Sequence, residues 1–235
     1  MIDSKQKVIG VVGGMGPYAT VSFFQELVDL TPAKKDWEHL HIIIDDNPKI
    51  PSRTRAVLYG ETSPVEGIVK SINGLQGMGA EVVTLPCNSA HYFFNDIISK
   101  INIPLLNLVE IASDGIKKRG LKKPLILGSY VTTHEKLYSE YLPEAIYPQG
   151  EWAEMIIDFI EEIKLKSEDV AWEEKRKYFQ VIQEYWKQID SVILACTELS
   201  IVFRTNEKTD IPIIDSTLEY ARATVAYARG KNIYD

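Results

Sequence analysis

The sequence lacks any apolar stretch long enough to cross a membrane. The apolar run at residues 7–12 is also too short for the core of a signal peptide, and no cleavage-site pattern follows it. We therefore expect a cytoplasmic protein with no membrane partner. Cysteine is scarce, because the 235 residues include only Cys87 and Cys196. Since structural disulfides are rare in the cytoplasm, we interpret both residues as free thiols.

Basic residues are also fewer than acidic residues. The chain has 26 Lys and Arg against 33 Asp and Glu, a formal net charge of −7. A net acidic chain is a poor electrostatic partner for nucleic acid, so we expect no nucleic-acid partner. The basic cluster at residues 117–123 precedes an apolar run, and we interpret it as a solvated loop. Hydrophobic residues make up 45% of the chain, which is enough for the core of a globular protein.

Short apolar runs alternate with longer amphipathic patterns along the chain. The runs predict strands at residues 7–12, 39–46, 81–85, 103–108, 124–129, 191–195 and 211–215. Between the runs, patterns such as residues 64–79 are typical of helices with one apolar face. Strands that alternate with helices predict parallel sheets covered on both faces. We therefore predict an α/β fold with two similar Rossmann-like, or flavodoxin-like, lobes that are related by a pseudo-twofold axis.

The second half of the chain resembles the first, which we interpret as two related lobes, although strand–turn–helix units also resemble one another by chance. In each half a strand ends at a cysteine, a polar turn follows, and an Ile-Pro strand comes later. Pro104 lies 17 residues after Cys87, and Pro212 lies 16 residues after Cys196. The predicted lobes are residues 1–113, completed by the C-terminal helix 216–235, and residues 114–215.

Both cysteines lie where a strand gives way to a helix, at the edge of a parallel sheet where ligands bind. The small polar residues that follow them suit a helix N-terminus, where amides and the helix dipole lower a thiol's pKa or hold a carboxylate. These residues are Asn88 and Ser89 after the first cysteine, and Thr197 and Glu198 after the second. A single cysteine is as readily a small buried hydrophobe. Two thiols facing each other across a cleft suit the transfer of a proton from one face of a carbon to the other.

Other polar groups have two interpretations each. The glycine loop at residues 10–20, which includes Met15, lacks the dinucleotide spacing and the P-loop Lys, and its amides either hold an anion or form a tight turn. Arg53 either grips a carboxylate with two parallel hydrogen bonds or lies on the surface. Lys164 ends an amphipathic helix, where a Lys also suits the dipole. His91 would need further ligands to bind zinc, so we expect no metal site.

Together the segments GGMGPYAT, NPKIPSRT, LPCNSAH, FIEEIKLK, ACTELS and IPIIDST resemble the aspartate/glutamate racemase superfamily, and its aspartate racemase branch in particular. The matches run in the family's order from residue 10 to about residue 217. The resemblance implies two pseudo-symmetric α/β lobes, a homodimer, no pyridoxal cofactor, and Cys87 and Cys196 as the catalytic acid/base thiols. The substrate-binding residues that it implies are Met15, Arg53, Asn88, Ser89, Thr132, Lys164, Thr197 and Glu198.

The chain departs from the family pattern at three places. The family usually has Thr where this chain has Ser89, and Pro where this chain has Ser200. It also usually has an Ala-Thr-x-Gly-Thr stretch where this chain has GSYVTTHEKLY. Ser129 and Thr132 are the hydroxyl candidates in that stretch.

The predicted function is a cofactor-independent racemase that interconverts L- and D-aspartate by a two-thiol acid/base mechanism, with glutamate as a second candidate substrate. The alternatives are another member of the superfamily, such as a maleate isomerase or a hydantoin racemase, and a two-lobed protein that binds a small carboxylate without chemistry.

Overall fold

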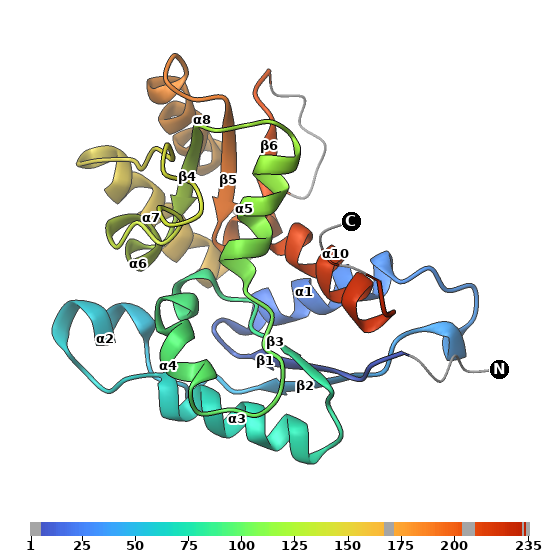
Figure 1. The fold of residues 1–235 in the computed structure, drawn as a ribbon. Helices are drawn as coiled ribbons and strands as arrows, with labels where there is room; N and C mark the ends of the chain where they lie inside the picture. The colour runs from blue at the N-terminus through green and yellow to red at the C-terminus, as the bar shows by residue number, and fades with distance from the viewer. Residues whose placement is uncertain (1–5, 167–171, 204–209, 232, 234–235) are drawn as a thin grey trace. The chain divides into compact units, whose positions relative to one another are not determined.

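The computed structural model describes residues 6–166, 172–203, 210–231 and 233 (Figure 1). The chain groups into two units. Unit 1 is Met1–Pro86, Phe93–Leu108 and Tyr220–Asp235, and unit 2 is Cys87–Tyr92 and Val109–Glu219. The main difference from the predicted lobes concerns the candidate site, because the turn Cys87–Tyr92 groups with unit 2 although it follows a strand of unit 1.

Unit 1 is built on a parallel sheet with the strand order β2–β1–β3. Its strands are β1 (Ile9–Gly13), β2 (Ile42–Asp46) and β3 (Val82–Thr84). A single parallel bridge between Val83 and Leu105 adds a fourth position beyond β3. The predicted strand at residues 103–108 is reduced to this bridge, because the residue before Leu105 is a proline and donates no ladder hydrogen bond.

Helices cover both faces of the unit 1 sheet, with α3 on one face and α1 and α10 on the other (Figure 1). The helices that lie mainly in this unit are α1 (Pro17–Leu30), α2 (Arg53–Tyr59), α3 (Val65–Gly77), α4 (Phe94–Ile98) and α10 (Ser216–Ala228), and a 3-10 turn, η1, spans Asp36–Glu38. Helix α3 buries Ile68, Ile72 and Leu75, so the predicted apolar face is confirmed. On the other side Phe23 of α1 stacks on Tyr220 of α10, with ring centroids 5.6 Å apart.

Unit 2 has a second parallel sheet, β4–β5–β6. Its strands are β4 (Pro124–Gly128), β5 (Ser191–Ala195) and β6 (Ile213–Asp215). A parallel bridge between Leu125 and Ile146 adds a position beyond β4. When the strands and the single-residue bridge of each unit are numbered in chain order, both sheets therefore have the spatial order second–first–third–fourth. The repeat that the sequence predicts is present in the topology, and each cysteine follows the third strand of its sheet.

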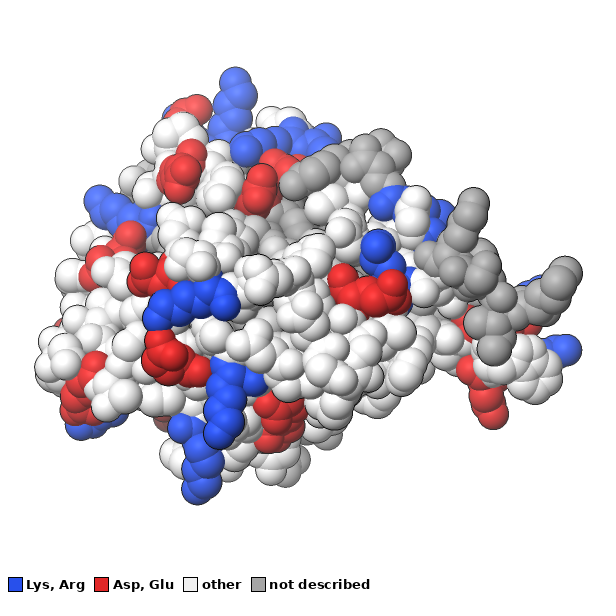
Figure 2. Space-filling model, turned by 60° about the horizontal axis from the view of Figure 1, so that its bottom comes forward, with Lys and Arg blue, Asp and Glu red and all other residues white. Residues whose placement is uncertain are grey.

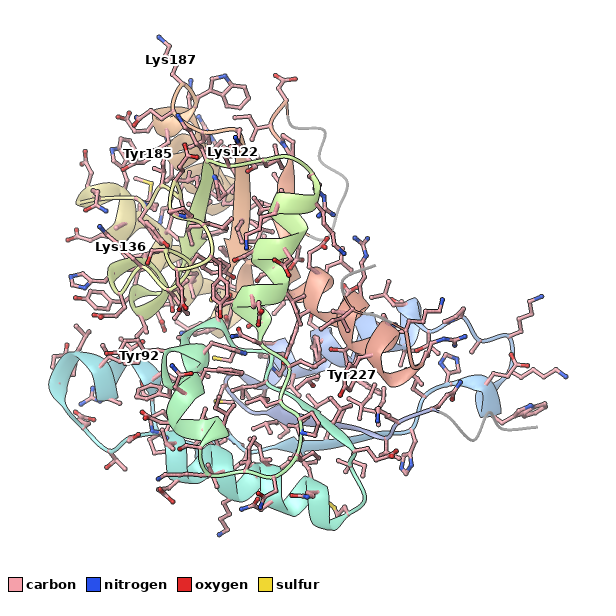
Figure 3. The ribbon with its side chains drawn as sticks, in the orientation of Figure 1. Tyr92, Lys122, Lys136, Tyr185, Lys187 and Tyr227 are labelled. Carbon is pink, nitrogen blue, oxygen red and sulfur yellow. The ribbon has the colours of Figure 1, made fainter. Side chains whose placement is uncertain are left out.

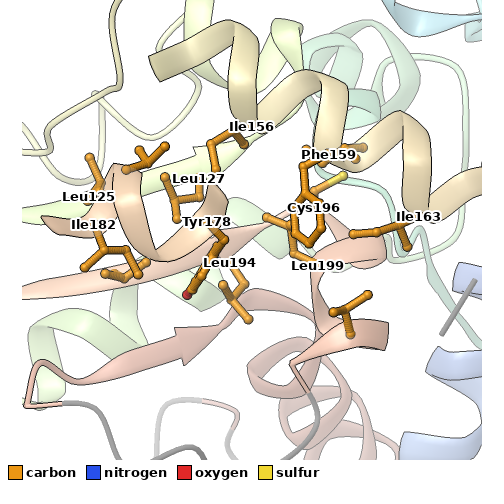
Figure 4. Close-up of a cluster of buried hydrophobic side chains, with 14 of the residues drawn as sticks. Leu125, Leu127, Ile156, Phe159, Ile163, Tyr178, Ile182, Leu194, Cys196 and Leu199 are labelled. Carbon is orange, nitrogen blue, oxygen red and sulfur yellow. The ribbon is translucent and has the colours of Figure 1, made fainter. Parts of the chain in front are cut away.

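The helices of unit 2 pack on both sides of β5. They are α5 (Leu108–Lys118), α6 (Tyr130–His134), α7 (Glu151–Lys166), α8 (Trp172–Tyr185) and α9 (Thr197–Val202), and the turn η2 spans Asn88–Phe93. Because successive side chains of a strand point to opposite faces, Leu194 and Cys196 join the cluster under α7 and α8, whereas Ile193 and Ala195 join the cluster under α5. Figure 4 shows the first cluster, which includes Cys196 and Phe159.

The predicted α/β class with two parallel sheets is confirmed, and the pseudo-twofold relation stays a prediction. Over the described ranges no helix combines the length and apolarity that crossing a membrane requires. The basic cluster at residues 117–123 is largely exposed, but it begins in the last turn of α5 and not in a loop. Lysines there suit the negative end of the helix dipole. On the face drawn in Figure 2, basic and acidic side chains are interspersed.

Candidate active site

The first cysteine opens a closed turn at the end of β3. The thiol of Cys87 is 5% exposed, and its Sγ lies 3.4 Å from Ser89 Oγ. Nδ1 of the buried His91 donates to the carbonyl oxygen of Cys87 at 3.0 Å, which fixes the proton on that nitrogen. The residues that follow form the 3-10 turn η2, not the α-helix N-terminus that the sequence predicts. Through that hydrogen bond the buried His91 packs on and caps this segment.

The residue after Cys87 ties this turn to unit 2. Tyr138 OH donates to Asn88 Oδ1 at 2.6 Å, and Asn88 Nδ2 donates to Ser216 Oγ at 3.1 Å. Ser216 Oγ in turn donates to the carbonyl oxygen of Leu194 at 2.7 Å. These partners explain why the turn groups with unit 2. Sequence reasoning missed Tyr138 and Ser216, although Ser216 lies within the matched segment IPIIDST.

The second cysteine is a buried thiol with an acidic partner. Cys196 is 8% exposed and precedes α9, and its Sγ donates to Glu198 Oε2 at 2.9 Å. Burial, and then the charge of Glu198 and this hydrogen bond, raise the pKa of Cys196 well above the usual range of a thiol. The sequence-based expectation of a lowered thiol pKa is wrong for Cys196. The nearby carboxylate and the apolar cluster outweigh the Glu198 amide and Lys164, which both act to lower it.

Lys164 near the end of α7 supplies positive charge to this part of unit 2. Burial acts to lower the pKa of Lys164, but the charges of Cys196 and Glu198 and a hydrogen bond to Glu161 together raise it. Lys164 Nζ donates to Glu161 Oε1 at 2.6 Å, and the Lys164 side chain remains 41% exposed. The amine is therefore a charged group that interacts with the second cysteine and stays open to an anionic ligand.

The hydroxyl candidates lie at the same sheet edge as Cys196. Gly128 and Ala195 are paired in register at the carboxyl ends of β4 and β5. The fully buried Thr132 follows Gly128, and its Oγ1 lies 3.3 Å from Ser129 Oγ. A Cβ on Gly128 would lie 2.8 Å from the Ala195 carbonyl oxygen, so a glycine is required for this approach. In Figure 3, Lys136, which follows α6, is labelled below Lys122 in unit 2.

Two candidate residues, Met15 and Arg53, lie together in unit 1. Arg53 begins α2, and its Nη2 donates to the Met15 carbonyl oxygen at 3.2 Å while its Nη1 donates to the carbonyl oxygen of Pro51 at 3.2 Å. The buried Nε of Arg53 has no hydrogen-bond partner, which is uncommon for a buried donor. Gly14, the residue before Met15, has φ +85°, and a Cβ on it would lie 2.2 Å from the Asn47 carbonyl carbon.

The structure thus brings together two sets of candidates, one in each unit. Met15 and Arg53 are in unit 1. The candidates in unit 2 are Cys87, Asn88, Ser89, Thr132, Lys164, Cys196, Thr197 and Glu198. Thr197 and Glu198 are both buried at the start of α9. Within the described part of the chain, no group of three or more His, Cys, Asp or Glu side chains is suited to hold a metal ion.

The sequence model of the Asp/Glu/Hydantoin racemase family matches residues 12–224. The chain therefore belongs to this family, and the predicted membership of the aspartate/glutamate racemase superfamily is confirmed. At the level of the family, the prediction of an enzyme of the isomerase class is confirmed as well.

Individual relatives are similar over nearly their whole length. A broad specificity amino-acid racemase of Bacillus subtilis (strain 168) is 27% identical over 232 residues, which cover 93% of this chain and 97% of the relative. An aspartate racemase of Picrophilus torridus has a TM-score of 0.84 and 28% identity, and the match covers 96% of this chain and 95% of that one. A glutamate racemase of Bacillus anthracis, at 18% identity and a TM-score of 0.66 over 96% of this chain and 84% of that one, shares the fold.

Proposed function

We propose that this protein is a pyridoxal-independent amino-acid racemase that interconverts L- and D-aspartate through two thiols. The observation that carries the proposal is the equivalence of the two cysteines. Cys87 and Cys196 each follow the third strand of a sheet of the same topology, and both group with unit 2. One buried cysteine is commonly only a packing residue. A pair at equivalent positions is what a reaction on two opposite faces of one carbon requires.

The reaction needs one thiolate and one thiol. The thiolate removes the α-proton, so that the Cα–H bond breaks, an S–H bond forms, and the electron pair is delocalised into the α-carboxylate. The second thiol then gives its proton to the opposite face of the same carbon, and its S–H electron pair stays on sulfur. The enantiomer leaves, and the two sulfurs have exchanged their protonation states.

Glu198 sets the resting state of this pair. The raised pKa of Cys196, caused first by burial and then by Glu198, keeps this sulfur protonated at neutral pH. Cys196 is therefore ready to act as the acid. When the reaction runs in the other direction Cys196 must act as the base, and the Glu198 carboxylate at 2.9 Å is the group placed to receive its proton.

The polar residues of the site bind the substrate in this proposal. Lys164 and Arg53 are the candidates for its side-chain carboxylate, since both are cationic and Arg53 has an N–H without a partner. The α-carboxylate and the amine are left to Asn88, Ser89 and Thr197, with Ser129 and Thr132 as further hydroxyl donors and Met15 as a further candidate. Donors fixed beforehand around a developing negative charge stabilise the transition state.

Aspartate is the preferred substrate in this proposal, and glutamate is the second candidate. The similarity to an aspartate racemase at 28% identity supports aspartate. The similarity to a broad specificity racemase at 27% identity makes the breadth of the substrate range a question to measure. We also propose that the protein acts in the cytoplasm and that it forms a homodimer, the second of which the resemblance implies.

The test is a panel of amino acids incubated with purified protein in deuterated water. The protein receives no pyridoxal phosphate and is first dialysed against a chelator. Nuclear magnetic resonance follows loss of the α-hydrogen, and chiral chromatography follows the enantiomers. We expect both signals, fastest with aspartate. Absence of exchange with every amino acid would leave a carboxylate-binding module as the better account, and activity that returns only with added metal would remove the cofactor-free mechanism.

A further inference from the structure

A chain of three hydrogen bonds within unit 2 includes the two bonds that connect the cysteine turns. It runs from Tyr138 OH to Asn88 Oδ1 at 2.6 Å, from Asn88 Nδ2 to Ser216 Oγ at 3.1 Å, and from Ser216 Oγ to the Leu194 carbonyl oxygen at 2.7 Å. Asn88 directly follows the first cysteine, and Leu194 lies two residues before the second on β5. A polar connection between the turns therefore passes through Ser216.

The donors and acceptors of this chain have one arrangement. The Leu194 carbonyl oxygen can only accept a hydrogen bond, so the Ser216 hydroxyl donates its one hydrogen there and must accept from the Asn88 amide. The Asn88 amide nitrogen therefore faces Ser216, and its oxygen faces the Tyr138 hydroxyl. The three side chains are at most 3% exposed, so no bulk water competes for these bonds. The orientation of Asn88 is thus set by two residues that the sequence did not suggest.

We propose that Ser216 and Tyr138 are positioning residues that hold the Cys87 turn at a fixed place relative to the Cys196 turn. We call this relative placement of the two turns their register. The inference rests on the proposed function, because it concerns two sulfurs that serve one carbon. Removal of the α-proton requires one correctly placed sulfur. Completion of racemisation requires both, on opposite faces. Loss of register therefore impairs the second step more than the first.

This difference separates a positioning role from a general structural role. A misplaced partner thiol lets the first sulfur return a solvent-exchanged proton to the same face. Deuterium then accumulates in the unreacted enantiomer. The ratio of this exchange to racemisation rises if register is lost. A variant that is merely less stable has fewer active molecules, which lowers both rates equally and leaves the ratio unchanged.

The experiment compares Ser216→Ala with Ser113→Ala as a matched control. Ser113 is also fully buried and also donates to a backbone carbonyl at 2.7 Å, that of Val109 within α5. With aspartate in deuterated water, we expect Ser216→Ala to racemise about 3- to 10-fold more slowly at saturating substrate, the loss that one hydrogen bond of ordinary strength causes. The exchange ratio should rise by a similar factor. The control should keep the wild-type ratio.

Tyr138→Phe is the second variant, because it removes only the hydroxyl and preserves the packing of the ring. It should shift the ratio in the same direction. An unchanged ratio in both Ser216→Ala and Tyr138→Phe, with rates that follow the folded fraction, would overturn the positioning role and leave the proposed function intact. A wild-type protein that neither exchanges nor racemises any amino acid would overturn the proposed function and the positioning role together.

Discussion

Replacing Glu198 with glutamine should make the Cys196 thiol easier to ionise. In the folded protein, burial is the largest cause of the raised pKa of Cys196, and the charge and hydrogen bond of Glu198 come next. The variant keeps the burial and the shape of the side chain but removes the negative charge. Lys164, whose charge acts to lower the pKa of Cys196, should then dominate the local field.

The size of the effect follows from the lost interaction. A hydrogen bond to a charged group contributes about 1.5–3 kcal/mol, and about 1.36 kcal/mol corresponds to a factor of ten in an ionisation equilibrium. At a fixed pH below the pKa of Cys196, the thiolate fraction of Cys196 should therefore rise by a factor of about 10 to 100 in Glu198→Gln. The thiol should still ionise less readily than an exposed cysteine, because the apolar neighbours remain.

The assay exploits the scarcity of cysteine. Because the chain has two cysteines, the variant Cys87→Ala leaves Cys196 as the only thiol. Its rate of alkylation by iodoacetamide at fixed pH reports the thiolate fraction. Adding Glu198→Gln should accelerate alkylation, and adding Lys164→Gln should slow it. Glu154→Gln, an exposed change on α7, is the control. Alkylation at an unchanged or lower rate in Glu198→Gln would refute the argument that Glu198 keeps this thiol protonated.

Two further predictions concern the rest of the molecule. Arg53→Lys should raise KM for aspartate even though it keeps the charge, because an ammonium group cannot reproduce the planar fork of the guanidinium, which donates to the Met15 and Pro51 carbonyl oxygens and leaves Nε for a carboxylate; kinetics equal to wild type would remove Arg53 from the site. Burial is the main cause that raises the pKa values of Cys196, Tyr138 and Tyr220, and that of Tyr147 to about 12. The contribution of these four neutral groups to the free energy of unfolding is fully present at pH values below their unfolded-state pKa values. It is lost as pH rises, because the unfolded chain then releases protons that the folded chain keeps. The free energy of unfolding from urea titrations should fall above about pH 9, by at most about 1.4 kcal/mol per pH unit for each group. A flat profile from pH 8 to 11 would contradict it.

Local patterns were enough to predict most of the fold. The strand β5 was predicted at its observed bounds, since four consecutive apolar residues follow Ser191 and all five positions are buried. The Ile146 bridge was missed because one paired residue leaves no pattern in a sequence. The helix after Cys87 was predicted from its polar residues, and the 3-10 turn forms there instead because Asn88 and His91 make other hydrogen bonds.

The environment of the two thiols could not be predicted in the same way. Asn88 and its partners Tyr138 and Ser216 are separated by 50 and 128 residues, and nothing in a local pattern encodes such a pairing. The pKa of Cys196 depends on burial under α7 and α8, which is a property of packing. Motifs marked the candidate residues, whereas the raised pKa of Cys196 follows from its neighbours in space.

The most direct test of the two-thiol mechanism uses the two single-cysteine variants with aspartate in deuterated water. If each sulfur serves one face of the α-carbon, Cys87→Ala and Cys196→Ala should both lose racemisation. Each should still exchange the α-hydrogen of one enantiomer slowly, and the two variants should retain opposite enantiomers, because one base remains in each. A Cys196→Ala protein that racemises aspartate at close to the wild-type rate would show that the second cysteine is only a packing residue, and would contradict the account.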